Sequence, residues 1–295
     1  MHPFRSMLFV PGHRPDWADK AVRSGADAIV LDLEDAVPEP LKVDARTTVA
    51  ATIARLRAEG VATAIFVRPN GLATGLSGAD LETAVVPGVD GLLLPMVTSG
   101  EDVIRWDALV DWFERRNNVT KISFVITIET VGAIENCRAI AAASPRVAGL
   151  VGQSAARADL AREVGYRWSE EGLETLYLRS RILLACKEFG LHPVTALWEN
   201  IEDTAGLRRF AERGLALGYR GQIAIHPSHI AVLQQVYSPD PDEIAFNEGL
   251  VAAFEEAVAQ GNGAVRYRGA HIDKAHADTA RAWLRQARNV LDGPI

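Results

Sequence analysis

Cysteine is scarce in this sequence, and its scarcity limits both the chemistry and the compartment. Cys137 and Cys186 are the only two cysteines in 295 residues, and their spacing matches no common metal-binding motif. Two cysteines so far apart also provide no disulfide framework of the kind that small secreted proteins use. The sequence therefore predicts a reducing, cytoplasmic setting.

Long hydrophobic runs and an excess of positive charge are missing as well. No stretch approaches the roughly 20 apolar residues that cross a membrane. The apolar stretch near the start, MHPFRSMLFVPG, is too short for a signal sequence and ends at Pro11-Gly12. The formal net charge of −7 argues against nucleic acid or an anionic membrane as the main partner. We therefore expect a small-molecule partner, with no nucleic acid and no membrane.

The glycine-rich phosphate loops G-x-G-x-x-G and G-x-x-x-x-G-K-[ST] are also absent, which disfavours a doubly wound nucleotide-binding sheet. The sequence instead contains short apolar runs that alternate with helical patterns. These strand-like runs are 6–10, 28–31, 64–67, 91–94, 122–128, 147–151, 193–197 and 221–225. This alternation predicts an α/β protein, a (β/α)8 TIM barrel.

The barrel pattern ends before the end of the chain. We expect residues 1–240 to form the TIM-barrel catalytic domain and residues 241–295 to form a C-terminal helical extension. Helical periodicity covers about 242–290, with one break near 261–269. This extension is predicted to pack on the barrel or on a neighbouring subunit.

The second strand-like run carries an unusual concentration of negative charge at its end. Residues 28–31 have no polar face, as expected for a strand that is covered on both sides. The run leads directly into Asp32, Glu34 and Asp35. Carboxylates at the end of a buried strand are costly unless a cation, an arginine or a ligand compensates them. The alternative interpretation is a solvated acidic loop.

Other strand-like runs also end in polar residues, and in a barrel these residues converge on one mouth. The residues collected in this way are Arg14, Asp32, Glu34, Asp35, Arg68, Asn70, Glu129, Gln153, Ser154, Thr195 and His226. Acids combined with one arginine suit a small anionic substrate, held together with a divalent cation. His226, which precedes Pro227, fits a structural role better than that of a base, and Ser154 lacks recognisable His and Asp partners for a nucleophile.

Several motifs in the same stretches resemble a known family. They are RSMLFVPG (5–12), GADAIVLDLEDAV (25–37), FVRPNGL (66–72), DGLLLPMV (90–97), ITIET (126–130), SPRVAGLVG (144–152) and AIHPSHI (224–230). In this order they resemble the HpcH/HpaI aldolase–citrate lyase family, and within it the CitE-like branch related to the citrate lyase β-subunit.

The resemblance implies a TIM barrel, a homo-oligomer of three or six subunits, and a carbon–carbon lyase. Such an enzyme cleaves a 3-hydroxy-acyl thioester, such as citryl-, malyl- or citramalyl-CoA, into an acyl-CoA and an oxo-acid. Arg68 matches the arginine that binds the oxo-acid and stabilises the enolate, and Glu129 matches one of the two carboxylates that bind Mg²⁺ and, with it, the substrate. Glu34 and Asp35 match the acidic catalytic pair at the edge of the metal and thioester site.

The sequence departs from the family pattern at four positions. Ala155 stands where the second metal-binding aspartate is expected, 26 residues after Glu129. Met96 and Gln222 replace lysines, and Thr195 replaces an aspartate. The resemblance therefore implies a Mg²⁺ site that is weakened or absent.

A replacement for the missing carboxylate can be sought nearby. Asp32 or Asp35 could supply it. Asp159 would share a helical face with Ala155, but at 1.5 Å per residue it would sit about 6 Å further along that helix. Arg5 and Arg14 are candidates for the phosphates of CoA.

Three functional interpretations remain open. The first is a carbon–carbon lyase with a weakened Mg²⁺ site. The second is an acyl-CoA thioester hydrolase, in which water replaces the carbon nucleophile. The third is a non-catalytic member of the family that binds an oxo-acid or CoA.

Overall fold

The structure is a computed structural model that describes residues 3–291. Within this part the chain forms two compact units, residues 3–237 and residues 238–291. The first unit contains every residue that the sequence places at the barrel mouth.

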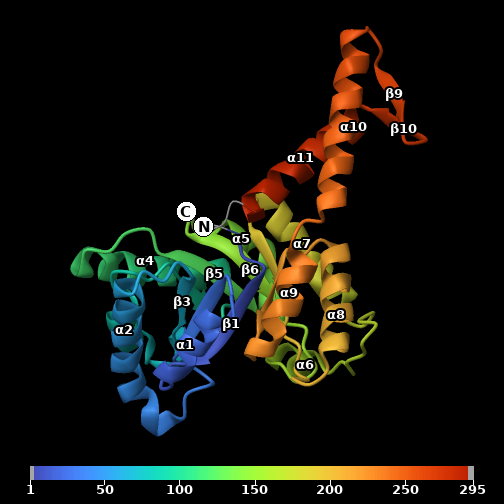
Figure 1. The fold of residues 1–295 in the computed structure, drawn as a ribbon. Helices are drawn as coiled ribbons and strands as arrows, with labels where there is room; N and C mark the ends of the chain where they lie inside the picture. Colours follow the sequence, from blue (N-terminus) through green and yellow to red (C-terminus); the bar gives the residue numbers. More distant parts are fainter. Residues whose placement is uncertain (1–2, 292–295) are drawn as a thin grey trace. The chain divides into compact units, whose positions relative to one another are not determined.

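The first unit is a closed barrel of eight parallel strands in sequential order, with helices between them (Figure 1). This confirms the predicted (β/α)8 fold. The strands are β1 (Ser6–Pro11), β2 (Ala28–Asp32), β3 (Ala64–Arg68), β4 (Gly91–Leu94), β5 (Ser123–Ile128), β6 (Val147–Gly152), β7 (His192–Thr195) and β8 (Gly221–Ala224).

The α-helices of this unit surround the barrel (Figure 1). They are α1 (Pro15–Arg23), α2 (Lys42–Ala58), α3 (Ser77–Ala84), α4 (Gly100–Asn117), α5 (Val131–Ala142), α6 (Asp159–Val164), α7 (Leu176–Phe189), α8 (Thr204–Leu217) and α9 (Ile230–Tyr237). Short 3₁₀ turns are η1 (Glu39–Leu41), η2 (Leu72–Thr74) and η3 (Pro227–His229).

Side chains of the strands point alternately into the barrel and out towards the helices. The interior is filled by one apolar cluster, formed by Phe4, Met7, Ala28, Val30, Phe66, Leu93, Val125, Val151, Val194 and Ile223. The neighbours of these residues, such as Ile29 and Leu31 of β2, belong to the larger cluster between strands and helices. The strands are therefore apolar on both faces, which explains why they read as continuous apolar runs.

Successive side chains of a strand point to opposite faces, so the residue two positions after an interior core residue also points inwards, at the mouth of the barrel. This holds for Asp32 after Val30 on β2 and for Arg68 after Phe66 on β3. Asp32 and Arg68 are direct partners in the register of the two strands, so their side chains leave the sheet side by side on the same face. The core packing of the barrel thus positions the charged residues above it.

Two helical details differ from the sequence-based expectation. Helix α3 is not evident from periodicity because it is short and contains Gly78. Helical periodicity predicts a stretch over 159–189 with an interruption near 165–168; the interruption is present but longer, because α6 ends at Val164, where Gly165 adopts φ 78, and α7 begins only at Leu176.

The second unit comprises α10 (Pro241–Ala259), an antiparallel hairpin of β9 (Ala264–Tyr267) and β10 (Ala270–Asp273), and α11 (Lys274–Leu291). It has an apolar cluster of its own, formed by Leu250, Phe254, Ile272, Ala277 and Ala280. The expected extension is therefore helical, but the break expected near 261–269 is part of a β-hairpin. Hydrophobic periodicity does not predict this hairpin, since each of its strands has only four residues.

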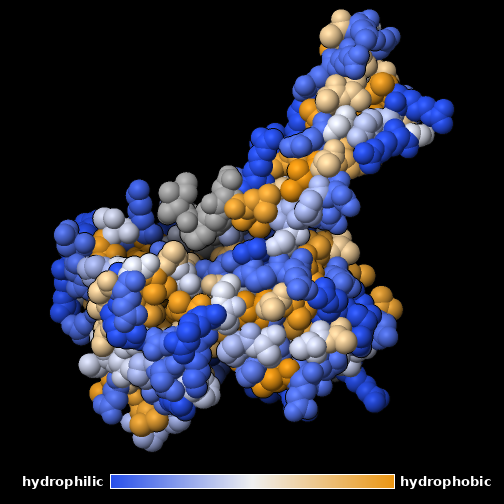
Figure 2. All heavy atoms as spheres, in the orientation of Figure 1, coloured by the Kyte–Doolittle hydropathy of each residue, from blue (hydrophilic) through white to orange (hydrophobic). Residues whose placement is uncertain are grey.

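Hydrophilic and hydrophobic residues are interspersed on the face that Figure 2 presents. Within residues 3–291, the structure contains no helix that is long and apolar enough to cross a membrane.

Gly91 of β4 provides a test of the close packing inside the barrel. A Cβ atom at this position would lie 2.5 Å from Cε1 of Phe66 and 2.6 Å from the carbonyl oxygen of Ser123. We expect Gly91→Ala to lower the free energy of unfolding by ~3 kcal/mol, because neither neighbour can move without disturbing the barrel. Urea denaturation measures the change. Gly78→Ala on α3, where a Cβ meets open space, is the matched control and should not destabilise the protein.

Candidate active site

The carboxyl ends of the strands enclose a cavity of about 560 Å³, a size typical of sites for small ligands. Its walls come from the carboxyl-terminal parts of β1, β2 and β3, from residues that follow β2, β5, β6, β7 and β8, and from α6. The residues that line it are Phe9, Asp32, Asp35, Ala36, Arg68, Glu129, Gln153, Ala155, Arg157, Ala158, Asp159, Arg162, Leu197, Glu199 and Ile225.

A bidentate ion pair between Arg68 and Asp32 forms one wall of the cavity. Arg68 donates from Nε to Asp32 Oδ1 over 2.7 Å and from Nη2 to Asp32 Oδ2 over 2.6 Å. Asp32 is fully buried and also accepts hydrogen bonds from the backbone N–H groups of Glu34 and Ala36. Burial alone would lower the pKa of Arg68, but the charge and hydrogen bonds of Asp32 outweigh it and raise that pKa. The guanidinium is therefore charged, rigid and oriented.

Glu34 and Asp35 lie at the outer edge of the same guanidinium. Arg68 Nη1 is 3.0 Å from Glu34 Oε2 and 3.6 Å from Asp35 Oδ2. Burial raises the pKa of Glu34 to about 8, and the negative charges of Asp35, Glu129 and Asp32 add to this effect, while Arg68 opposes it. Glu34 is therefore protonated at neutral pH and can exchange a proton close to pH 8. The side chain of Asp35 is 72% exposed and is open to solvent.

Glu129 stands across the cavity from this group, just after β5. Its Oε1 accepts hydrogen bonds from the backbone N–H of Met96 over 2.7 Å and from the hydroxyl of Thr127 over 2.8 Å. Met96 adopts φ 52, an uncommon conformation for a residue other than glycine. Burial raises the pKa of Glu129, although both hydrogen bonds oppose the shift.

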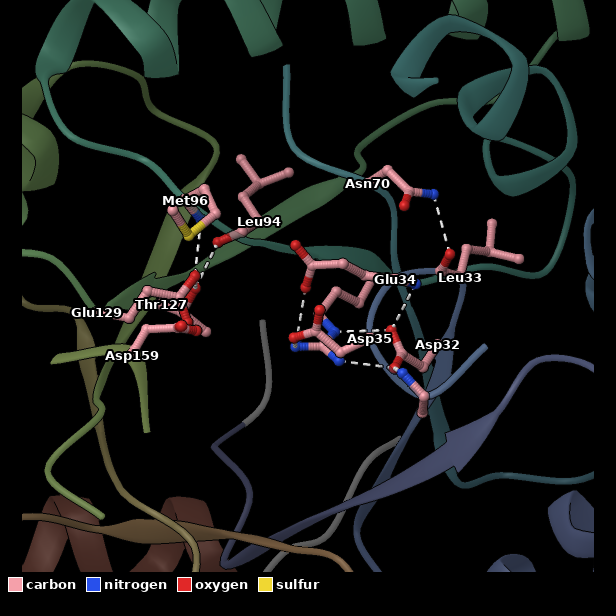
Figure 3. A network of polar contacts seen from close by, with 12 residues as sticks. Asp32, Leu33, Glu34, Asp35, Asn70, Leu94, Met96, Thr127, Glu129 and Asp159 are labelled. Carbon is pink, nitrogen blue, oxygen red and sulfur yellow. Dashed lines mark hydrogen bonds and ion pairs between the residues drawn. The ribbon is translucent and has the colours of Figure 1, made fainter. Parts of the chain in front are cut away.

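Figure 3 shows Asp32, Glu34 and Asp35 on one side of the polar network and Glu129 with Asp159 on the other. The structure therefore brings Arg68, Glu34, Asp35 and Glu129 to one site, as the sequence predicts. Ala155 also lines the cavity. The roles expected for these residues stay predictions.

Asp32 does not fit the role of a replacement metal ligand, because both of its oxygens are engaged by Arg68 and by backbone N–H groups. Asp159 is closer to the site than the sequence suggested. Helix α6 begins only at Asp159, and residues 155–158 are not helical, so the expected separation of about 6 Å along one helix does not apply.

Other residues predicted at the mouth have structural contacts instead. Asn70 donates from Nδ2 to the Leu33 carbonyl over 2.9 Å and to Asp80 Oδ2 over 2.7 Å, which ties the β2 loop to α3. His226 caps η3, where its Nδ1 accepts a hydrogen bond from the backbone N–H of Ser228. These contacts support the structural role expected for His226.

Neither Arg5 nor Arg14 is among the residues that line the cavity, and a role of Arg14 towards the phosphates of CoA stays a prediction. Arg5 precedes β1, at the amino ends of the strands, and its Nη2 is 2.8 Å from Asp27 Oδ1. Arg14 pairs with the exposed Asp16 and lies over the ring of Trp17.

Sequence reasoning missed several residues of the cavity. Phe9 lies under the guanidinium, with Arg68 Cζ 4.8 Å from its ring centroid. Arg157, Arg162 and Glu199 come from loops after β6 and β7 or from α6. Phe9 is two residues after Met7 on β1, so strand alternation could have predicted that it points inwards. The loop residues follow no such periodicity.

Mg²⁺ binds oxygen ligands, usually one or two carboxylates together with substrate and water. Within residues 3–291 no group of three or more His, Cys, Asp or Glu side chains is placed to hold a metal ion. However, Gln153 lines the cavity, is 7% exposed, and its Oε1 has no hydrogen-bond partner among the described residues. Glu129 and Gln153 are therefore the candidate oxygen donors for a hard cation.

The raised pKa of Glu34 leads to a prediction for stability. The folded protein retains this proton up to about pH 8, whereas the unfolded chain loses it near 4.5. The resulting stabilisation is fully present below pH 4.5 and is lost as the pH rises through 8. Glu34→Gln removes this dependence, so the variant should gain stability relative to wild type between about pH 5 and 8, by a few kcal/mol at about 1.4 kcal/mol per pKa unit.

Urea unfolding across this pH range tests the prediction. Glu39→Gln, an exposed position in η1, is the control and should follow the wild-type profile. If the free energy of unfolding of wild type and of Glu34→Gln changed in parallel with pH, the pKa of Glu34 would not be raised in the folded protein.

Comparisons with known proteins place this geometry in a family. The family model described as HpcH/HpaI aldolase/citrate lyase matches residues 5–227. The chain is 34% identical over 295 residues to (3S)-malyl-CoA thioesterase of Cereibacter sphaeroides, covering 98% of this chain and 96% of the relative. It is 33% identical over 309 residues to L-malyl-CoA/beta-methylmalyl-CoA lyase of the same species, with coverage of 98% and 96%.

A solved structure agrees with these relatives. The CitE protein of Mycobacterium tuberculosis, in complex with magnesium, acetoacetate and coenzyme A, has a TM-score of 0.74 at 28% identity, covering 97% of this chain and 98% of that one. The fold, the matched residues and the full-length relatives lead to one conclusion: this chain belongs to the HpcH/HpaI aldolase/citrate lyase family.

Proposed function

We propose that this protein is a carbon–carbon lyase that cleaves a 3-hydroxy-acyl-CoA thioester, such as malyl- or citramalyl-CoA, into an acyl-CoA and an oxo-acid. The observation that carries the proposal is the meeting of Arg68 and Glu129 in one cavity. A fixed guanidinium and a buried carboxylate, from strands far apart in the chain, face the space that a small anion would occupy. The relatives include a lyase that acts on malyl-CoA and its methyl derivative.

In this proposal Arg68 binds the carboxylate of the oxo-acid portion. Asp32 holds Nε and Nη2, so Nη1, which now contacts Glu34, is the group that turns to the substrate. A guanidinium that is already oriented stabilises developing negative charge without reorganisation at the moment of reaction. Phe9 beneath it keeps water from one face.

The carboxyl pair Glu34 and Asp35 supplies the acid–base group. Cleavage requires removal of the proton from the 3-hydroxyl; the C2–C3 bond then breaks, its electron pair forms the enolate of the thioester, and this carbon takes up a proton. Because its pKa of about 8 leaves Glu34 protonated at neutral pH, Glu34 would donate the proton to the enolate carbon, and the carboxylate of Asp35 would accept the proton of the hydroxyl.

Mg²⁺, when bound, would polarise the oxygen that becomes the carbonyl of the oxo-acid. Glu129 would hold it, with Gln153 as a neutral oxygen donor. Both line the cavity, and Figure 3 shows Glu129 on the side opposite Glu34 and Asp35.

Thioester hydrolysis is the second candidate. It is favoured by Ala155, which removes a carboxylate expected in the lyases of the family, and by the likeness to a relative named as a malyl-CoA thioesterase. In that reaction water attacks the thioester carbonyl and free CoA leaves.

Assembly and compartment remain proposals as well. We propose a homotrimer or hexamer on the basis of the family resemblance, which mass photometry can test. A cytoplasmic setting is supported by the cysteine content, since Cys137 and Cys186 are both free and buried.

Arg68→Lys tests the role of the guanidinium. Removal of all positive charge would leave the buried Asp32 without its cationic partner, at a cost of roughly 3–5 kcal/mol, so the lysine variant is preferred to alanine. We expect it to fold but to bind pyruvate or glyoxylate at least tenfold more weakly, because an ammonium group cannot hold Asp32 and a carboxylate with parallel bonds. Calorimetric titration measures this, with Arg116→Lys on α4 as the control. Unchanged affinity in Arg68→Lys would remove Arg68 from the binding site.

Product analysis separates the two reactions. Incubation with malyl-CoA and citramalyl-CoA should yield acetyl-CoA together with glyoxylate or pyruvate if the protein is a lyase. Free CoA with intact malate or citramalate would instead establish the hydrolase. Formation of neither product would favour the interpretation as a non-catalytic member of the family.

A further inference from the structure

Lys42 stands at a position where a positive side chain is electrostatically unfavourable. It is the first residue of helix α2. The amino end of a helix carries a partial positive charge, which disfavours a cation there by roughly 0.3–1 kcal/mol. The side chain is also half-buried and does not extend freely into water. A residue that contradicts a local rule in this way indicates a compensating contact elsewhere in the fold.

The compensating contact is made by the ammonium group of Lys42, which reaches across to the loop after β2. Its Nζ donates hydrogen bonds to the carbonyl oxygens of Leu33 and Glu34, each over 3.1 Å, and to Oδ1 of Asn70. A lysine ammonium has three donors, so each of them has one acceptor. Three acceptors that converge on one atom suit a compact ammonium group and do not suit a planar guanidinium.

Asn70 is itself held in one orientation. Its Nδ2 donates to the Leu33 carbonyl over 2.9 Å, a contact visible in Figure 3, and to Asp80 Oδ2 over 2.7 Å. Asp80 is fully buried, and its Oδ1 accepts a hydrogen bond from Nε of Arg46 over 2.7 Å. Because both amide hydrogens of Asn70 are used, its Oδ1 is the atom that faces Lys42. The acceptors of the ammonium group are therefore fixed before it arrives.

The loop of residues 33–36, which carries the carboxyl pair of the site, is thus held from two sides. From inside the barrel, Asp32 accepts hydrogen bonds from two of its backbone N–H groups. From outside, Lys42 donates to two of its carbonyl groups. Between these anchors Glu34 Oε2 lies 3.0 Å from Arg68 Nη1. Loss of the lysine would release the outer side of the loop and leave the pair between Asp32 and Arg68 intact.

We propose that Lys42 is a positioning residue of the active site: its ammonium group holds the loop of residues 33–36 from outside the cavity and so keeps Glu34 and Asp35 beside Arg68. Lys42 is not among the residues that line the cavity, so it acts through the loop and not by contact with the substrate. The inference rests on the proposed function for the chemistry of the carboxyl pair, whereas the placement of the loop can be measured without substrate.

Lys42→Met tests this role, because it removes the ammonium group and keeps the length of the side chain. General acid–base catalysis contributes about 10²–10⁴-fold, so a displaced carboxyl pair should lower kcat for malyl-CoA at least tenfold. KM, and the affinity for pyruvate measured by calorimetry, should stay within a few-fold of wild type, because Asp32 still holds Arg68. Lys20→Met, which removes the same charge at an exposed position of α1, is the matched control and should behave as wild type.

Chemical rescue makes the assignment specific to the ammonium group. In Lys42→Cys treated with 2-bromoethylamine, the thiolate displaces bromide and forms S-aminoethylcysteine, which carries an ammonium group at nearly the reach of lysine. Its kcat should return to within a few-fold of wild type, whereas untreated Lys42→Cys and Lys42→Arg should stay low. Wild type treated in parallel is the control, since Cys137 and Cys186 are both buried.

A second readout needs no activity. Backbone N–H groups of residues 33–37 are hydrogen-bonded to Asp32, to the Arg68 carbonyl and within the loop. In Lys42→Met, hydrogen–deuterium exchange of a peptide covering residues 33–41 should accelerate by about tenfold or more, because the free energy of local opening falls. Peptides from β5 and β6 should exchange as in wild type, which distinguishes a loosened loop from a general loss of stability.

Unchanged exchange of this loop in Lys42→Met would overturn the proposal, as would equal acceleration across the barrel or a loss of pyruvate affinity that parallels the loss of kcat. The outcome is separable from that of the proposed function. If wild type turns over no malyl-CoA, the proposed function fails, and exchange of the loop alone decides whether Lys42 positions it. If wild type cleaves malyl-CoA and Lys42→Met retains its kcat, the lyase stands and the positioning role fails.

Discussion

The buried ion pair between Asp32 and Arg68 is the constraint on which the site depends. The two residues are register partners at the ends of β2 and β3, and both point into the barrel, where the cost of removing charge from water is high. Two parallel contacts of 2.6 and 2.7 Å, together with two backbone N–H groups, compensate that cost. These contacts hold the guanidinium in one orientation, and Glu34 and Asp35 lie beside it.

This fixed charge divides the cavity into two sides with different chemistry. Around Arg68 lie Glu34 and Asp35, and the opposite wall carries Glu129 and Asp159. A substrate with a carboxylate at one end and a hydroxyl near its middle would span the two. Such an arrangement favours cleavage next to the hydroxyl, since charge can be stabilised on one side while a proton is moved on the other.

The substitution at Ala155 does not leave the cavity neutral. The loop after β6 brings two other oxygen donors, Gln153 and Asp159, to the same space. Loops at the carboxyl ends of barrel strands can change in this way without disturbing the strands, because the core alternation of Val125 and Val151 lies below them.

The sequence by itself determined the barrel and most of its mouth. Continuous apolar runs require strands covered on both faces, and the strict period of two fixes which of the following residues point inwards, as for Asp32 and Arg68. What only the tertiary structure decided is the path of the loops and the state of the charges. The turn before α6 places Asp159, and burial sets the pKa of Glu34, because both depend on groups distant in the chain and not on local periodicity.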